Sequence, residues 1–85
     1  MISLEKQDIT ELILYISELV TEINLNTNNE AFMMHYGHTK QIDISIYLNG
    51  WEDKKCADIN LSAYYDKIDY KENLERIIET LKSVS

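Results

Sequence analysis

The sequence has no proline and only two glycines among its 85 residues. No proline-rich or glycine-rich segment is therefore present that could act as a flexible linker between domains. A chain of this length also has room for one small hydrophobic core and not for two. We expect residues 1–85 to form a single small domain.

Cysteine is equally scarce and occurs once, as Cys56. A lone cysteine forms no disulfide within the chain, which agrees with a reducing compartment. The first residues lack the basic and apolar regions of a secretory signal, and no apolar run approaches the ~20 residues of a membrane span. We therefore expect a cytoplasmic protein with no membrane partner.

Acidic residues outnumber basic residues, with fifteen Asp and Glu and eight Lys and Arg. The net charge is −7, of which −5 lies in residues 1–31, 0 in 32–56 and −2 in 57–85. Such a surface repels nucleic acid, whose binding needs Lys and Arg on the phosphates. We expect no direct nucleic-acid partner, and a protein with a basic groove is one possible partner instead.

The acidic excess follows a helical spacing. Intervals of three and four residues separate four carboxylates with one tyrosine among them, so these side chains share one side of a helix. We name this set the acidic stripe: Asp8, Glu11, Tyr15, Glu18 and Glu22. The stripe is either a solubilising outer face or a contact with a partner, and the sequence leaves both open.

Apolar residues are plentiful, and their period changes along the chain. A 3.6-residue period predicts amphipathic helices over about 4–25 and 69–84. Alternation with a period of two predicts half-buried strands over about 41–49 and 56–64, and about 30–36 is a third candidate strand. We predict an α+β fold of order α-β-β-β-α, in which a three-stranded antiparallel meander carries both helices on one face.

The helix starts carry candidate capping residues. The first helix begins either at Ser3 or at Asp8, which with Glu11 would form a capping box. The second helix has Asp69 at its cap position and Glu72 three residues later.

The first hairpin raises a question of register, because a shift of one residue reverses which side chains face the core. A three-residue loop over 37–39 would turn Phe32, Met34 and Tyr36 inward and leave His35 in solvent. A two-residue loop over 38–39 or a four-residue loop over 37–40 would reverse both orientations. We predict the three-residue loop, since it buries the larger apolar set.

Residues able to carry chemistry are few. His35 and His38 are three apart, and only Asp43 and Cys56 could join them as metal ligands or as a catalytic triad. Paired ligands of a zinc site, a phosphate-binding glycine loop, a dinucleotide motif and a cysteine-enzyme signature are all missing from the sequence. We predict a protein that is not an enzyme, with no catalytic residues, metal or cofactor.

Aromatic residues give a further indication of binding. Tyrosine and tryptophan are enriched at interaction hot spots because they bury a large area at low entropic cost. Beside the acidic stripe, we predict partner contacts on the open sheet face or in the turn after it, at His35, Tyr47, Trp51 and Tyr64. A polar solvated face is the alternative, since any one-sided sheet has one.

The segment DISIYLNGW at residues 43–51, preceded by His38, resembles segments of small proteins from phages and other mobile elements. With its size and acidity, the chain resembles phage-encoded inhibitors of host defence such as anti-CRISPR proteins. The resemblance implies an inhibitor that occludes a host defence or nucleic-acid-binding protein, and it assigns no functional residue. The alternatives are a structural or regulatory homodimer and a small-ligand sponge.

Overall fold

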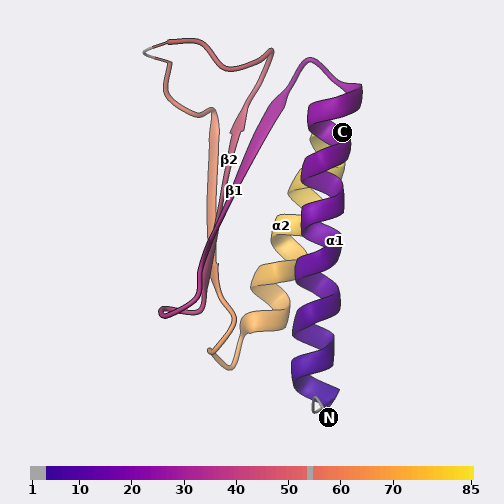
Figure 1. Cartoon of the computed structure of the whole chain (residues 1–85), viewed down its shortest axis with the longest axis vertical. Helices are drawn as coiled ribbons and strands as arrows, with labels where there is room; N and C mark the ends of the chain where they lie inside the picture. The colour runs from indigo at the N-terminus through magenta and orange to yellow at the C-terminus, as the bar shows by residue number, and fades with distance from the viewer. Residues whose placement is uncertain (1–3, 54) are drawn as a thin grey trace.

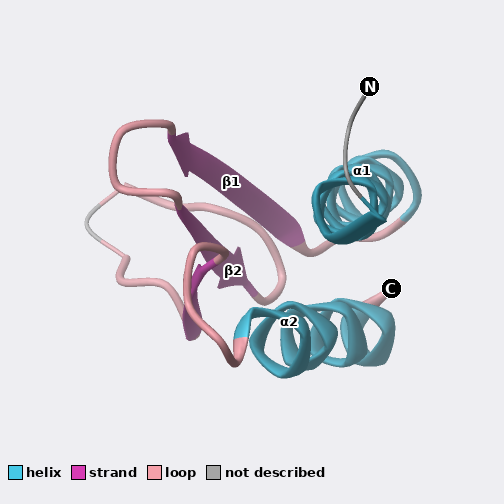
Figure 2. Ribbon diagram, turned by 90° about the horizontal axis from the view of Figure 1, so that it is seen from below, coloured by secondary structure: helices cyan, strands magenta, loops and turns pink. Residues whose placement is uncertain are grey.

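The computed structural model describes residues 4–53 and 55–85. Its elements are helix α1 (Leu4–Asn26), strands β1 (Glu30–Tyr36), β2 (Gln41–Tyr47) and β3 (Ile59–Tyr64), and helix α2 (Tyr70–Val84). The strands form one antiparallel sheet in the order β1-β2-β3. Both helices lie on the same side of that sheet (Figure 1, Figure 2), which confirms the predicted α+β meander.

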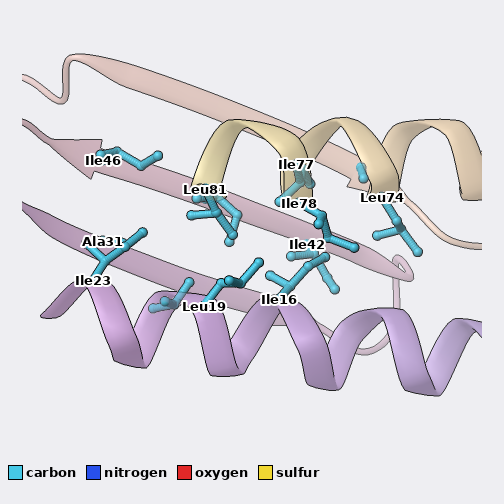
Figure 3. Packing of buried hydrophobic residues seen from close by; sticks show 13 residues of the cluster. Ile16, Leu19, Ile23, Ala31, Ile42, Ile46, Leu74, Ile77, Ile78 and Leu81 are labelled. Atoms are coloured by element: carbon cyan, nitrogen blue, oxygen red, sulfur yellow. The ribbon is translucent and has the colours of Figure 1, made fainter. Parts of the chain in front are cut away.

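The core is built on the alternation of side chains along β2. Ile42, Ile44 and Ile46 are at most 1% exposed and point toward the helices, while the residues between them face the other way. Figure 3 shows the apolar stripes of both helices directed at this row. The helices contribute Ile16, Leu19, Val20, Ile23, Leu74, Ile77, Ile78 and Leu81, and the edge strands contribute Ala31 and Ala63.

The connection between β2 and β3 differs from the prediction. Strand β2 ends at Tyr47 and β3 begins only at Ile59. Between them Lys55 Nζ donates to the Leu48 carbonyl at 2.6 Å and lies 3.5 Å from Asp58 Oδ2. The same carboxylate oxygen accepts the Leu48 N–H at 2.8 Å. These contacts hold the segment as a folded loop, so the alternation over 56–58 does not become strand.

The predicted helix caps are also corrected. Helix α1 already includes Leu4, so Asp8 lies inside the helix and does not begin it, and Ser3 lies outside the described residues. Asp69 does precede α2, but its side chain makes no capping hydrogen bond. Its backbone carbonyl instead accepts the Asn73 N–H at 3.2 Å.

The first hairpin has the register opposite to the predicted one. Residues 37–40 form a four-residue turn, and across it Met33 pairs with Ile44 and His35 with Ile42. Phe32 and Met34 are consequently 45% and 55% exposed on the open face of the sheet. The prediction of a three-residue loop is therefore wrong.

A side chain on α1 explains this register. Asn24 Nδ2 donates to the Ala31 carbonyl at 2.9 Å, and its Oδ1 accepts the Ala31 N–H at 2.7 Å. Both backbone groups of Ala31 therefore point away from β2, toward the outer edge of β1. In a strand, residues whose N–H and C=O groups point to one edge also have their side chains on one face of the sheet. With Ala31 fixed in this way, the side chains of Ala31, Met33 and His35 lie on the side of the helices.

Replacing Asn24 should test this explanation. Asn24→Ala leaves the Ala31 N–H and C=O without their partner, and we expect it to lower the free energy of unfolding by about 1 to 3 kcal/mol. Asn26→Ala, at an exposed position in the same helix, should change it by less than about 0.5 kcal/mol. Urea denaturation measures both values, and equal values would contradict a role for Asn24 in fixing β1.

Candidate interaction surfaces

The acidic stripe lies on the flank of α1 that faces α2. The Tyr70 hydroxyl donates to Asp8 Oδ2 at 3.4 Å, and Lys82 Nζ lies 5.6 Å from the centre of the Tyr15 ring. Glu11, Glu18 and Glu22 are exposed, Tyr15 is partly exposed and Asp8 is half-buried. The five predicted residues therefore share one accessible side of a single rigid helix.

The carboxylates of the stripe form no ion pair with a described cation. Among the side chains of residues 7–53 and 55–85, the one ion pair is that of Lys55 with Asp58, in the loop between β2 and β3. The ammonium of Lys82, which lies over the Tyr15 ring, offsets part of the charge, and the stripe remains a patch of net negative charge. Its attraction for a basic surface is long-ranged at low salt and falls off within about 10 Å at 0.1 M salt.

The open face of the sheet is polar across β2 and β3. Asp43 Oδ1 accepts hydrogen bonds from Gln41 Nε2 and from Ser62 Oγ, both at 2.7 Å. Ser45 Oγ donates to Asn60 Oδ1 at 3.0 Å. These side chains hydrogen-bond to one another along β2 and between β2 and β3, which is the behaviour of a solvated sheet face.

The part of the open face along β1 is apolar from Phe32 to Tyr36, after Glu30 at the start of the strand. The rings of Phe32 and Tyr47 meet edge to face with their centres 5.4 Å apart, and the Tyr36 hydroxyl lies 3.5 Å from Met34 Sδ. We name this set the β1 strip: Phe32, Met34, Tyr36 and Tyr47. Contiguous exposed apolar groups of this kind mark interaction surfaces more often than scattered ones do.

The predicted aromatic contacts separate into three places. Tyr47 and Tyr64 lie on the open face, as predicted, and Tyr64 is 41% exposed. Trp51 is exposed in the loop after β2. His35 does not lie on the open face, because the four-residue turn places it on the helix side, where its Nε2 is 2.6 Å from the Tyr65 hydroxyl.

A groove of about 660 Å³ lies at the end of the sheet where Trp51 is found. The α1–β1 connection and the β2–β3 loop form it, and amide side chains are prominent in its wall. Asn29 Nδ2 donates to the Val84 carbonyl at 2.9 Å, and Asn29 Oδ1 accepts the Asn49 N–H at 3.0 Å. The amides of Asn24 and Asn29 thus join segments of the chain and are already hydrogen-bonded.

The residues considered for chemistry lie apart. His38 is in the turn between β1 and β2, whereas Cys56 is an exposed free thiol in the loop at the opposite end of the sheet (Figure 1). Asp43 lies between them on the open face, bonded to Gln41 and Ser62. Among the side chains of residues 7–53 and 55–85, no three His, Cys, Asp or Glu converge as a metal site would require. Neither helix, where described, has the length and apolar character needed to cross a membrane.

Comparison with known proteins identifies no relative. Protein-family models, curated proteins and solved structures were each searched, and none matches this chain. The candidate surfaces therefore rest on the geometry of the chain itself.

Sequence reasoning missed two of these features. Phe32, Met34 and Tyr36 were assigned to the core, although the opposite parity of the same alternation places them outside. Asn24 lies near the end of the helix predicted over 4–25, and nothing in the sequence pattern indicated that its amide fixes β1. The hydropathy pattern holds no signal for either feature, because the register depends on one hydrogen-bonded contact between elements.

Substitutions should separate the β1 strip from the core. Phe32→Ala removes a side chain that is 45% exposed, and we expect it to cost less than about 1.5 kcal/mol of unfolding free energy. Ile44→Ala empties a fully enclosed position and should cost about 2 to 5 kcal/mol. Chemical denaturation of both variants provides the test, and a larger loss for Phe32→Ala would place the strip in the core.

Proposed function

We propose that this protein is a non-enzymatic inhibitor that binds a host protein through the acidic stripe and occludes a basic groove on it. The net negative charge of the stripe, whose carboxylates form no ion pair with a described cation, is the observation that carries the proposal. As a phage-type protein it would act in the cytosol of the host cell.

The stripe supports binding through its rigidity and spacing. Its carboxylates extend over roughly 21 Å of α1, at 1.5 Å per residue. Helix α1 is held by a buried row that includes Ile16, Leu19 and Ile23, so its backbone needs no ordering when a partner binds. Preorganised charge of one sign raises the rate of association with a surface of opposite sign.

Occlusion fits the stripe better than imitation of DNA does. Four carboxylates over that length give about one charge per 5 Å, whereas duplex DNA carries one per ~1.7 Å. Tyr15 adds an aromatic surface in the middle of the stripe, and the ammonium of Lys82 lies over its ring. A partner would therefore meet a mixed contact in which charge guides the approach and Tyr15 supplies buried area.

Affinity capture from a host lysate, followed by mass spectrometry, would identify the partner. With that partner, the triple variant Glu11→Lys, Glu18→Lys, Glu22→Lys should slow association at low salt by about tenfold or more, because attraction becomes repulsion. Stopped-flow or surface plasmon measurements at two salt concentrations would give the rates.

A matched control makes the same change in net charge elsewhere. Asp66, Glu75 and Glu79 are exposed outside the stripe, and their replacement by Lys should slow association less than the stripe variant does. If both triple variants had equal effects, net charge and not the stripe would guide binding. If neither had an effect, the stripe would be excluded as the contact.

A further inference from the structure

We propose that two copies of this chain associate through the outer edges of their β1 strands, forming one six-stranded sheet around a two-fold axis at Met34. The inference goes beyond the proposed function, because it concerns a different surface and a different partner. The observations that carry it are the open edge of β1, the self-complementary order of the β1 strip and the absence of Asp, Glu, Lys and Arg from residues 31–36.

The outer edge of β1 is open over part of its length. The outward backbone groups of Ala31 are bonded to Asn24. Because outward direction recurs every second residue, the N–H and C=O groups of Met33 and His35 point outward as well. Within the described chain these four groups have no hydrogen-bonding partner, and such an edge is a template for another strand.

Because the outward backbone groups of Ala31 are already bonded to Asn24, only one antiparallel register is available. The backbone groups of Met33 and His35 in both copies form hydrogen bonds only if Met33 of one copy pairs with the partner's His35. This register forms four backbone hydrogen bonds and leaves the contact between Asn24 and Ala31 intact. A shift toward the start of the strand would require the groups that Asn24 already occupies.

That register also matches the side chains on the open face. It places Met34 directly opposite the partner's Met34, in a pair without backbone hydrogen bonds, where side chains approach most closely. Phe32 then lies opposite the partner's Tyr36, and Tyr36 opposite the partner's Phe32. Two β1 strips thus become one continuous apolar surface, with aromatic residues paired across the seam.

The charges of the two copies are kept away from this seam. On α1, Asn24 marks the flank beside the edge of β1, and Ser17 and Thr21 share that flank because they precede it by seven and three residues. The acidic stripe lies on the other flank, as the contacts of Asp8 and Tyr15 with α2 show. Two chains of net charge −7 can therefore meet along residues 31–36, which contain no Asp, Glu, Lys or Arg.

The helix layer allows the same arrangement. A two-fold axis perpendicular to the sheet makes the two α1 helices antiparallel on one side of it. Small side chains such as Ser17 and Thr21 on the facing flanks permit a close approach of helices. Both acidic stripes remain accessible in this dimer, so it neither requires nor prevents binding of another protein.

A charge-exchange experiment at Met34 tests the proposal. We expect the unmodified chain to sediment at twice its monomer mass of 10.0 kDa and to dissociate on dilution. Met34→Lys and Met34→Glu each place like charges opposite one another at the axis, so each variant alone should raise the dissociation constant about tenfold or more. An equimolar mixture of the two variants should restore the dimer.

Control variants and salt complete the design. Ser62→Lys introduces a charge on the same open face but on β3, and it should leave the dimer unchanged. Circular dichroism should show that all variants are folded, since Met34 is exposed. Added salt should strengthen the dimer by screening its net charge, whereas it should weaken binding through the acidic stripe.

Several results would overturn the proposal. A monomer at every concentration would exclude the dimer, and equal loss of dimer in Ser62→Lys would exclude this seam. A mixture of folded Met34 variants that stays monomeric would exclude the register. None of these results concerns the acidic stripe, so the proposed function would stand or fall separately.

Discussion

One row of isoleucines on the central strand sets the plan of the molecule. Ile42, Ile44 and Ile46 must leave water together, and only a layer on that side of the sheet can achieve this. Three strands spaced about 4.8 Å apart have a width of about 10 Å, close to the 8–10 Å between packed helices. Two helices are therefore enough to cover the sheet, and the described residues contain no third element that covers the other face.

The fold followed from the sequence because its two periods are long and clear. The row of isoleucines in β2 and the stripe from Ile16 to Ile23 in α1 each fit one periodicity. The start of β3 was not predictable from the sequence. The apolar alternation continues before Ile59, but the contacts of Lys55 and Asp58 hold that segment as a loop. Those contacts join residues that the periodic pattern treats as unrelated.

The candidate surfaces were predictable to different degrees. The acidic stripe depends only on spacing along one helix, so the sequence placed its five residues on one side correctly. The β1 strip depends on the register of the first hairpin. Judged by side-chain size alone, the register that buries Phe32 was the more favourable one. In the fold, the position beneath α1 is filled by Ala31, which is buried beside Ile23 and bonded to Asn24. A small residue allows the helix to come close enough for that contact.

The meander has a consequence for how the chain acquires its structure during synthesis. Each strand pairs with its neighbour in sequence, so the hairpins depend only on residues that are already close along the chain. The isoleucine row is covered completely only when α2 packs against α1 and β3. A ribosome-bound chain from which α2 has not yet emerged leaves this side of the core exposed. Cooperative folding therefore waits for α2, and until then the nascent sheet is open to chaperones and to misassembly.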